Sequence, residues 1–375
     1  KNGAEVYGYD IDPEKIKLLN SGKTFLDERE LISLWSENSE TMFFSEKLKL
    51  ANVYLIAVPT PLLDNETNCD LSFVNDAVIS ISKILEKNNS IILVSTCPVD
   101  TTSNISKIIY KNSGFVAGKD YHLAYCPERL YPGDTYNEII NNDHIIGGFS
   151  KNSGLVISEF YEEFISKNTQ ITSSKVAELA KLAENSFRDI NIAFANELAE
   201  IAYQNQEKIS DVINLSNLHP RVNILQPGIG VGGHCLPIDP WFLINKYQKH
   251  NISVIRASRQ LNDQIPLRLA RRIIKMILKS KQNEKKYIYD IAFLGYTYKP
   301  NIPDLRESPA KLIIDTIQNH NFRIYSYDPL VDLEISENEV LNNLNQAQMI
   351  ILLVEHKFLD KICKKINYIH WKEII

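Results

Sequence analysis

The stretches ANVYLIAVPTP at residues 51–61 and SIILVSTCP at residues 90–98 decide the fold of this chain. Each is a short apolar run that ends in a polar loop containing proline, and a helical pattern over Ser72–Glu86 separates the two. A strand, a helix and a second strand in this order indicate a βαβ unit with parallel strands. Because ligands of such sheets bind at the carboxyl ends of the strands, the loops that follow the two runs are candidate site loops.

The same alternation continues on both sides of this unit and predicts a first α/β lobe over residues 1 to about 165. Its expected elements are strands over Ala4–Tyr9, Ala51–Val58 and Ser90–Ser95 and helices over Pro13–Asn20, Ser72–Glu86 and Thr102–Tyr110. A second lobe of the same kind is predicted from strands over Ile288–Leu294, Phe322–Tyr327 and Met349–Val354 and helices over Pro309–Asn319 and Asn338–Asn345. Both lobes are therefore expected to be doubly wound parallel sheets with helices on both faces.

A long helix is predicted between the two lobes. From Leu155 to His219 the chain has no glycine or proline, and apolar residues recur at three-and-four spacing from Leu179 to Ile201. This period is that of an amphipathic helix, and a helix over Ser174–Gln206 is on the order of 50 Å long at ~1.5 Å per residue. A helix of this length is typical of a spine between two lobes or of a subunit interface. The expected domains are therefore residues 1–170, residues 171–265 and residues 266–375.

The composition excludes several classes of function. The 375 residues carry a formal net charge of −5, whereas nucleic-acid-binding domains usually carry a basic surplus. Apolar runs such as Asn52–Val58 and Met349–Val354 are far shorter than the roughly 18 residues that a membrane-spanning helix needs. The sequence shows no signal peptide, so the cytoplasm is the expected compartment. The five cysteines have no zinc-ligand spacing, so no metal site is expected.

The segment Gln226–Asp239 is the densest chemical signal, because it holds four of the 14 glycines of the chain within six residues. Glycines permit positive φ and close backbone approach, so this loop can surround a ligand with its N–H groups. Cys235 follows the glycines directly and is a candidate nucleophile, provided that a cation or a dipole favours its thiolate. The alternative interpretation is a glycine-rich turn with an incidental buried cysteine.

Three further clusters carry charged residues in positions suited to chemistry. Lys181, Asn185 and Arg188 share one face of the long helix, which is either a catalytic face or a solvated polar face. Glu128, in a loop after a short apolar strand, is either a general base or a salt-bridged surface carboxylate. Asp10 ends a strand, where an acidic residue typically hydrogen-bonds the ribose of NAD.

The last cluster lies in the loop at residues 295–308, which follows the first strand of the second lobe. Its two cations, Lys299 and Arg306, are suited to phosphate because loops after parallel strands face the ligand crevice and arginine binds phosphate in bidentate fashion. The alternative is a charged turn.

Taken in order, these motifs resemble the nucleotide-sugar 6-dehydrogenases, the family of UDP-glucose, UDP-N-acetylglucosamine and UDP-N-acetylmannosamine dehydrogenases. The matching segments cover essentially the whole chain: Tyr9-Asp10, Val58-Pro-Thr-Pro61, Ser95-Thr96, Cys126-Pro-Glu-Arg129, Glu178-Leu-Ala-Lys-Leu-Ala-Glu-Asn185, Gly232-Gly-His-Cys235 with Asp239, and Tyr298-Lys-Pro300 with Asp304-Leu-Arg306. The resemblance implies two Rossmann-like domains joined by a long central helix. The first would bind NAD, the last would bind a UDP-sugar, and the central domain would carry catalytic residues and form a homodimer.

The resemblance also implies a two-step, four-electron oxidation of the sugar C6 alcohol to a carboxylate, with two NAD⁺ reduced, in surface-polysaccharide synthesis. The Cys235 thiolate is expected to add to the intermediate aldehyde as a thiohemiacetal, and a second hydride transfer gives a thioester that water hydrolyses. Lys181 and Asn185 match residues that stabilise the oxyanion and hold a water. The other implied catalytic residues are Asp239, which assists the water or Lys181, Glu128 as general acid/base, and Thr96 beside the nicotinamide.

The resemblance assigns binding residues in the same way. The implied cofactor contacts are Asp10, Lys15, Pro59, Thr60, Thr96 and Arg306. The implied substrate contacts are Glu128, Arg129, Lys181, Asn185, Arg221, Gly232, Gly233 and Lys299.

Two departures from the family pattern bear on the function. Where the UDP-glucose branch has a second glutamate four residues after the first, this chain has Pro132, and the segment resembles the N-acetylhexosamine branch instead. UDP-N-acetylmannosamine is therefore the expected substrate, with UDP-N-acetylglucosamine or UDP-glucose as the alternative. The first strand and the Gly-rich phosphate loop of the family's N-terminal domain are expected to be missing from this chain, which starts at Lys1, and weak NAD binding is expected as a result.

Two functions of other classes stay open at this point. One is a single-step dehydrogenase or reductase of small hydroxy acids, which shares the lobe-helix-lobe plan but needs no thiol. The other is a catalytically impaired fragment that binds a nucleotide sugar.

Overall fold

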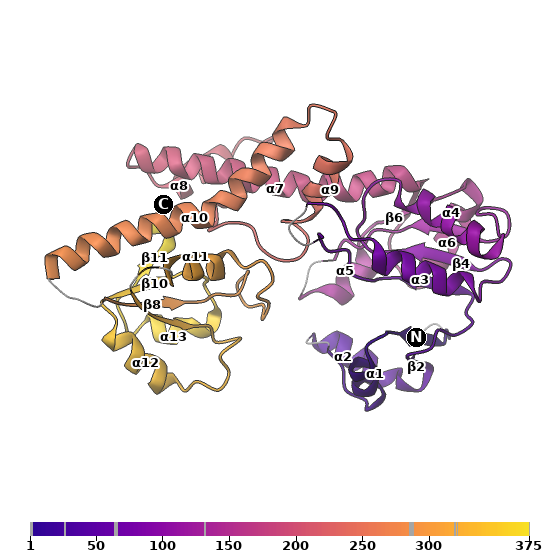
Figure 1. The fold of residues 1–375 in the computed structure, drawn as a ribbon, viewed down its shortest axis with the longest axis horizontal. Helices are drawn as coiled ribbons and strands as arrows, with labels where there is room; N and C mark the ends of the chain where they lie inside the picture. The colour runs from indigo at the N-terminus through magenta and orange to yellow at the C-terminus, as the bar shows by residue number, and fades with distance from the viewer. Residues whose placement is uncertain are drawn as a thin grey trace. The chain divides into compact units, whose positions relative to one another are not determined.

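The structure is a computed structural model that describes residues 3–25, 28–63, 67–130, 133–284, 289–318, 320 and 322–374. The chain divides into two compact units, Lys1–Ala183 and Glu184–Ile375, called unit 1 and unit 2 below. Figure 1 shows the elements of each unit.

Unit 1 is built around a five-stranded sheet in the order β3-β4-β5-β6-β7. Its strands are β3 (Val53–Ile56), β4 (Ser90–Leu93), β5 (His122–Tyr125), β6 (His144–Gly148) and β7 (Thr169–Ser173). The first three run parallel, as the alternation predicts, but β6 is antiparallel to β5. The prediction of an all-parallel sheet is therefore wrong at this point, because only the short helix α5 (Thr135–Asn141) separates β5 from β6 and no full crossover connection forms.

Helices cover both faces of this sheet, as predicted. Strand β4 is buried along its whole length, with Ile91 and Leu93 in one core cluster and Ile92 in the other, because successive side chains of a strand point to opposite faces. Helices α3 (Ser72–Ser82) and α4 (Thr101–Ser113) pack in the first cluster, and α6 (Lys151–Glu162) packs in the second. Helix α4 ends at Gly114, whose φ of 75° is the left-handed conformation that glycine adopts without a steric cost.

A separate two-stranded parallel sheet precedes the large one. It consists of β1 (Val6–Tyr9) and β2 (Met42–Ser45), which are connected through α1 (Pro13–Asn20), α2 (Arg29–Glu37) and the 3-10 turn η1 (Ser39–Thr41). Helix α1 begins where the sequence predicts, because the Asp12 side chain accepts from the backbone N–H of Glu14 and Pro13 occupies the first turn. The structure does not support the expectation that a first strand and a Gly-rich loop are missing, because that expectation rested only on where the sequence starts.

Helix α7 (Ser174–Gln204) is the predicted long helix, and it ends two residues before the predicted position. It starts in unit 1 and continues into unit 2, where it is followed by α8 (Ile209–Ser216), α9 (Asp239–Lys246) and α10 (Ser253–Glu284). No helix among the described residues is long and apolar enough to cross a membrane.

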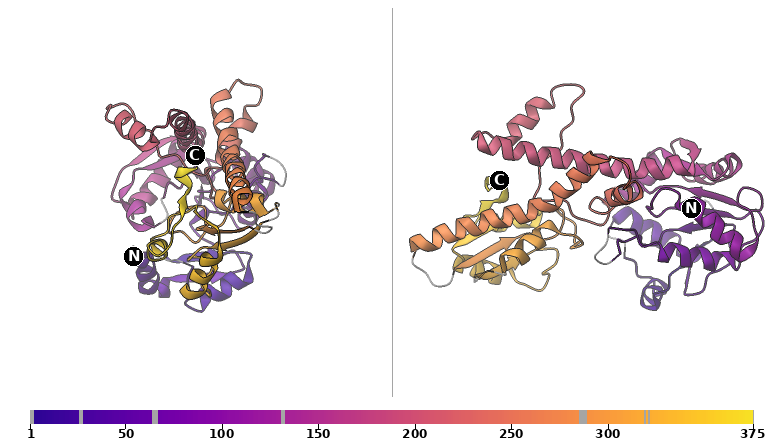
Figure 2. Two further views of the ribbon diagram at one scale, coloured as in Figure 1. Left: turned by 90° about the vertical axis from the view of Figure 1, so that its left-hand side faces the viewer. Right: turned by 45° about the horizontal axis from the view of Figure 1, so that its top comes forward.

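The second lobe, within unit 2, is a four-stranded sheet in the order β11-β10-β8-β9. Its strands run parallel, as predicted, but the two-residue strand β11 was not predicted. Its elements are β8 (Asp290–Leu294), α11 (Pro309–Gln318), β9 (Arg323–Tyr327), α12 (Glu337–Gln346), β10 (Met349–Leu352), the turn η2 (Lys357–Leu359), α13 (Asp360–Cys363), β11 (Ile369–His370) and the turn η3 (Trp371–Glu373). Helices α10 and α11 cover one face and α12 and α13 the other (Figures 1 and 2). The predicted element ends at Ile288 and Asn319 lie outside the described residues.

Candidate functional site

The glycine-rich segment forms an irregular loop between α8 and α9, and it packs closely against the loop that follows β8. A Cβ on Gly232 would lie 2.6 Å from the carbonyl oxygen of Glu307, and a Cβ on Gly233 would lie 2.9 Å from the Tyr298 ring. The Gly233 N–H also donates to the carbonyl of Arg306 at 3.0 Å. These glycines are therefore required for the contact between two loops of unit 2, whatever they contact in a ligand.

Cys235 begins the turn that leads from this loop into α9. Its carbonyl accepts hydrogen bonds from the backbone N–H of Ile238 at 3.0 Å and of Asp239 at 2.8 Å. The side chain is half-buried, and all five cysteines of the chain are thiols. The loop therefore presents a cysteine thiol directly in front of a helix that starts with a carboxylate.

Arg306 is the cation that the loop after β8 contributes near Cys235. Its Nε and Nη2 donate to the Asp304 carboxylate, with the shortest contact at 2.6 Å. The hydrogen bond to Asp304 raises the pKa of Arg306, and negative charge on Tyr298 and Cys235 raises it further against the opposing effect of burial. Arg306 therefore places a positive charge in the loop that packs against the glycine-rich segment, where its carbonyl accepts from the Gly233 N–H.

Asn185 and Asp239 form a buried hydrogen bond that links α7 to the first turn of α9. The Asn185 Nδ2 donates to Asp239 Oδ2 at 2.5 Å, and both side chains are almost fully buried. The Asn185 Oδ1 accepts from Arg188 Nη2 at 2.9 Å, so both ends of the amide are oriented. The interpretation of a fully solvated polar face is therefore wrong at Asn185.

Lys181 is also buried, with 8% of its surface exposed. Its Nζ donates to the backbone carbonyl of Glu128, within unit 1. The Glu128 side chain is exposed, and its Oε1 accepts from the backbone N–H of Arg129 at 2.7 Å. The Arg129 guanidinium in turn donates to the carbonyl of Asp143 at 3.1 Å. The structure therefore brings Lys181, Glu128 and Arg129 together within unit 1.

The predicted cofactor residues of unit 1 form two pairs. Thr60 follows Pro59 in the loop after β3, and its hydroxyl donates to the carbonyl of Thr96, after β4, at 2.7 Å. Asp10, at the end of β1, forms an exposed ion pair of 3.2 Å with Lys15 of α1. Each pair lies at the carboxyl end of parallel strands, which is where dinucleotides bind in such sheets.

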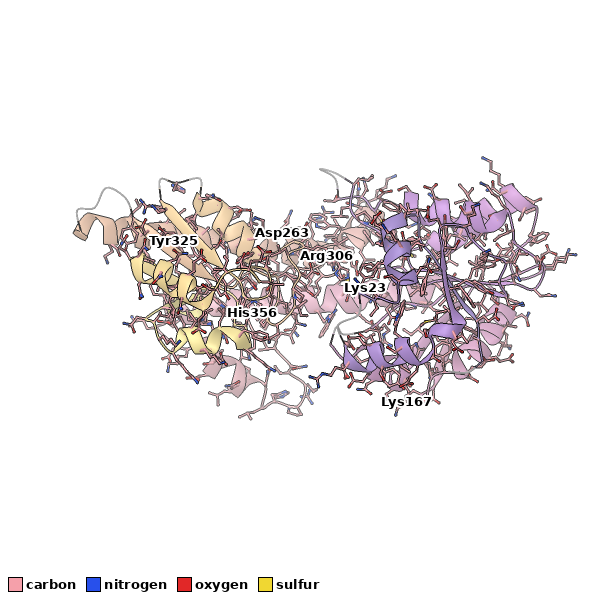
Figure 3. All side chains as sticks on the ribbon, turned by 90° about the horizontal axis from the view of Figure 1, so that it is seen from below. Lys23, Lys167, Asp263, Arg306, Tyr325 and His356 are labelled. Atoms are coloured by element: carbon pink, nitrogen blue, oxygen red, sulfur yellow. The ribbon has the colours of Figure 1, made fainter. Side chains whose placement is uncertain are left out.

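The remaining predicted substrate cations lie in loops of unit 2. Arg221 is exposed in the segment between α8 and the glycine-rich loop, and Lys299 is half-buried in the loop after β8. Figure 3 marks Arg306 and His356 on side-chain sticks of the same lobe. Pro132, on which the choice between sugar branches partly rests, lies outside the described residues.

Sequence reasoning gave no role to Glu178, which lies one helical turn before Lys181. Its carboxylate is fully buried and accepts from the backbone N–H of Asp100 at 2.7 Å, the backbone N–H of Thr102 at 2.8 Å and the Thr102 hydroxyl at 2.7 Å. Burial raises its pKa, and these hydrogen bonds oppose that shift. Glu178 therefore holds α7 against the loop that follows Thr96 and the start of α4. In the sequence it was marked only as the first residue of the helix motif at residues 178–185.

Sequence reasoning also missed Arg259 of α10, which is fully buried. Its Nη1 donates to Asp189 Oδ1 of α7 at 2.5 Å and to the carbonyl of Leu236, next to Cys235, at 3.2 Å. Asn262 adds a hydrogen bond to Asp189 Oδ1 at 2.9 Å. This network of hydrogen bonds connects the loop at residues 226–238, called the cysteine loop below, to α7 and α10. No pattern in the sequence distinguished Arg259 from a surface arginine.

Family models match nearly the whole chain. The NAD binding domain of the UDP-glucose/GDP-mannose dehydrogenase family matches residues 1–165, the central domain of that family matches residues 175–264, and its UDP binding domain matches residues 292–374. The chain belongs to the UDP-glucose/GDP-mannose dehydrogenase family. Cys235 lies within the match to the central domain, and Lys299 and Arg306 lie within the match to the UDP binding domain.

Individual members of the family are similar over almost all of the chain. A UDP-N-acetyl-D-mannosamine dehydrogenase of Methanococcus aeolicus is 40% identical over 359 residues, which is 94% of this chain and 80% of the relative. A solved UDP-D-ManNAc dehydrogenase from Pyrococcus horikoshii has a TM-score of 0.92 at 33% identity and covers 100% of this chain and 91% of its own. A UDP-N-acetyl-mannosamine dehydrogenase from Staphylococcus aureus has a TM-score of 0.87 at 32% identity, covering 100% of this chain and 94% of its own.

Proposed function

We propose that this protein is an NAD-dependent UDP-N-acetyl-D-mannosamine 6-dehydrogenase that supplies a uronic acid precursor for surface-polysaccharide synthesis. The observation that carries the proposal is the geometry around Cys235, whose own carbonyl accepts from the N–H of Asp239 while the Asp239 carboxylate accepts from buried Asn185. A thiol and a carboxylate on one turn, with an oriented amide from α7 bonded to that carboxylate, are the groups that a thioester pathway needs. The similarity to dehydrogenases of UDP-N-acetyl-D-mannosamine supports this sugar.

In the proposed reaction, the C6 alcohol loses a proton and a hydride to give an aldehyde, and the Cys235 thiolate forms a bond to the aldehyde carbon. The resulting thiohemiacetal loses its hydroxyl proton and a second hydride and becomes a thioester. Water then breaks the C–S bond, which releases the carboxylate and restores the thiol. Asn185 is proposed to hold the oxyanion or the water, because Arg188 and Asp239 fix the direction of its amide before substrate binds.

Lys181 and Glu128 are proposed to complete the catalytic set from unit 1, with Thr96 beside the nicotinamide. Lys181 would stabilise negative charge on the sugar oxygen, and its burial supports this role because water screens a buried charge little. Glu128 would act as general acid/base, and its exposed carboxylate supports this role because it can exchange protons with solvent. Asp239 is proposed to assist the hydrolytic water.

NAD would be held by Asp10, Lys15, Pro59, Thr60, Thr96 and Arg306, and when bound it supplies the hydride acceptor. The pairing of Thr60 with Thr96 at adjacent strand ends fits the ribose and nicotinamide part of a dinucleotide. UDP-sugar contacts are proposed for Arg129, Arg221, Gly232, Gly233 and Lys299, in addition to the catalytic residues.

The activity is tested by NADH absorbance after incubation of the protein with NAD⁺ and one of three sugars. We expect UDP-N-acetylmannosamine to give the highest kcat/KM, with UDP-N-acetylglucosamine and UDP-glucose far lower. A higher kcat/KM for either of the other sugars would overturn the proposed substrate. A Cys235→Ala variant is expected to form no uronate while it still binds UDP.

A homodimer through α7 is proposed from the apolar side chains that this helix leaves exposed. Phe187 is 62% exposed, Phe194 49% and Ile201 56%, at spacings that place them along one stripe. Multi-angle light scattering is expected to give the mass of a dimer for the native protein. A monomeric mass at micromolar concentration would contradict the proposal.

A further inference from the structure

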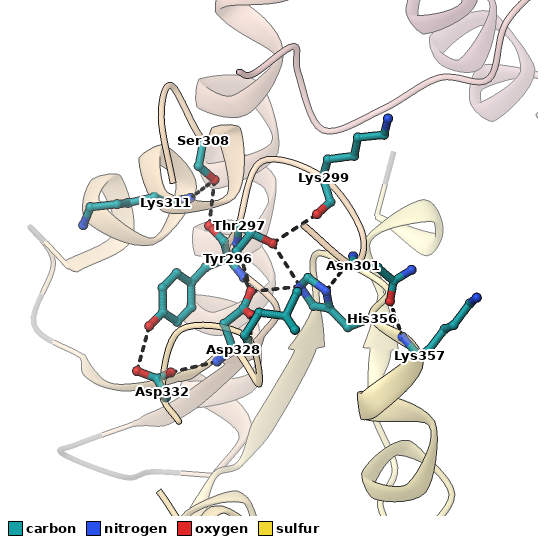
Figure 4. Close-up of polar contacts among 11 residues, drawn as sticks. Tyr296, Thr297, Lys299, Asn301, Ser308, Lys311, Asp328, Asp332, His356 and Lys357 are labelled. Atoms are coloured by element: carbon teal, nitrogen blue, oxygen red, sulfur yellow. Dashed lines mark hydrogen bonds and ion pairs between the residues drawn. The ribbon is translucent and has the colours of Figure 1, made fainter. Parts of the chain in front are cut away.

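A buried polar cluster lies where the parallel strands of the second lobe end. Thr297 follows β8, Asp328 follows β9 and His356 follows β10, and at most 1% of the surface of each residue is exposed (Figure 4). The carboxyl ends of parallel strands are the edge at which ligands bind. Burial of a charge is unfavourable unless the charge is paired, so the partners of this buried cluster indicate what it stabilises.

Asp328 is the acceptor on which the cluster is centred. Its Oδ2 accepts from the backbone N–H of Tyr296 at 2.7 Å, from the backbone N–H of Thr297 at 2.9 Å and from His356 Nε2 at 2.9 Å. Burial opposes its charge, but the hydrogen bonds from His356 and from backbone N–H groups outweigh burial and lower its pKa to about 2. Asp328 therefore stays ionised and holds the first residues of the loop after β8.

The hydrogen bonds of His356 fix which ring nitrogen carries the proton. The backbone N–H of Asn301 donates to His356 Nδ1 at 2.9 Å, so Nδ1 must present its lone pair. The proton is then on Nε2, which faces Asp328 Oδ2 and lies 3.0 Å from the Thr297 hydroxyl. His356 therefore bonds Asp328 through Nε2 and holds the backbone of Asn301, at the far end of the loop, through Nδ1.

The loop between these two anchors carries Lys299. The Thr297 hydroxyl lies 3.2 Å from the Lys299 carbonyl, and the Asn301 side chain accepts from the backbone N–H of Lys357 at 2.9 Å. Asn301 has a φ of 62°, the left-handed conformation that asparagine adopts more readily than most residues. Figure 4 shows the Lys299 side chain directed away from the cluster.

We propose that the Asp328–His356–Thr297 cluster positions the Lys299 loop for binding of a nucleoside diphosphate. His356 and Thr297 are positioning residues, since they contact the loop backbone rather than the ligand. This inference rests on the proposed function, in which Lys299 contacts the UDP-sugar. If the cluster has this role, the affinity for UDP depends on His356 Nδ1, which accepts from the backbone N–H of Asn301.

Two substitutions of His356 separate the two hydrogen bonds of its ring. In His356→Asn the side-chain oxygen occupies the position of Nδ1 and keeps an acceptor for Asn301, while the donor to Asp328 is lost. In His356→Gln the side-chain nitrogen occupies the position of Nε2 and keeps the donor, while the acceptor for Asn301 is lost. We expect isothermal titration with UDP to give a Kd raised about tenfold in His356→Gln, and a Kd within about threefold of native in His356→Asn.

Thr297→Val and Val340→Ala complete the test. Thr297→Val removes only the hydroxyl at the Lys299 carbonyl, and it is expected to raise the Kd for UDP even if His356→Gln does not fold. Val340 is 2% exposed in the core of the same lobe, so Val340→Ala is expected to lower Tm with the Kd unchanged. This control separates loss of loop position from loss of stability.

The outcomes distinguish this inference from the proposed function. No UDP binding by the native protein would overturn the proposed function and this inference with it. UDP binding by the native protein together with a native-like Kd in His356→Gln and Thr297→Val would overturn this inference alone, as would equal weakening in His356→Asn and His356→Gln.

Discussion

Removal of the buried Arg259 guanidinium is predicted to destabilise unit 2 strongly. In Arg259→Met the contacts to Asp189 Oδ1 at 2.5 Å, to the Leu236 carbonyl at 3.2 Å and to Asp263 Oδ1 at 2.8 Å are all lost. Neither Arg259 nor Asp189 exposes more than 1% of its side chain, so water cannot replace these partners. Removing one partner of a buried pair costs about 3–5 kcal/mol.

The assay is urea unfolding at pH 7.5, followed by tryptophan fluorescence, since Trp241 of α9 lies in the same unit. Arg271→Met is the matched control, because Arg271 is an exposed arginine of the same helix and its loss is expected to change the free energy of unfolding by less than about 0.5 kcal/mol. The double variant Asp189→Asn with Arg259→Met removes both charges, so we expect it to be more stable than Arg259→Met alone. A loss below about 1 kcal/mol in Arg259→Met, or a double variant less stable than that single variant, would refute the reasoning.

Three further predictions follow from buried groups. Burial raises the pKa of Asp189 to about 6 against the opposing charge of Arg259. The stability that the protonated Asp189 contributes is therefore fully present below about pH 4 and is lost as the pH rises through 6. In urea unfolding between pH 4 and 7, Asp189→Asn is expected to remove up to ~3 kcal/mol of this decline in the free energy of unfolding. An unchanged pH profile would contradict this. Glu178→Gln places an N–H donor against the donors of Asp100 or Thr102. It is expected to lower the free energy of unfolding by about 1–3 kcal/mol, seen as a lower Tm. An unchanged Tm would contradict this prediction. Gly232→Ala is expected to displace the cysteine loop and lower kcat/KM at least about tenfold, because its Cβ would lie 2.6 Å from the Glu307 carbonyl; native kcat/KM would show that the loops can separate without effect.

The alternation of apolar runs predicted most of the fold. Helix α1 and the long helix α7 begin at the predicted residues, because their caps and their period are local properties of the sequence. The antiparallel β6 was missed, since a four- or five-residue strand such as His144–Gly148, which ends in two glycines, has no strong period. Strand direction depends on the connection between strands, which the pattern alone does not contain.

The sequence singled out some residues of the candidate site and missed others. Helical period placed Lys181 and Asn185 on one face but left open whether that face is solvated, and the structure buries both. Arg259 and Glu178 escaped notice because their roles come from partners about 70 or more residues away in sequence. A charged residue in a helical pattern is usually on the surface, so only tertiary packing identifies the exceptions.

The most direct test of the account is the ratio of NADH formed to UDP-N-acetylmannosamine consumed in a reaction run to completion. A four-electron oxidation through Cys235 predicts two NADH for each sugar and a carboxylate product. One NADH for each sugar, or full turnover by the Cys235→Ala variant, would contradict it.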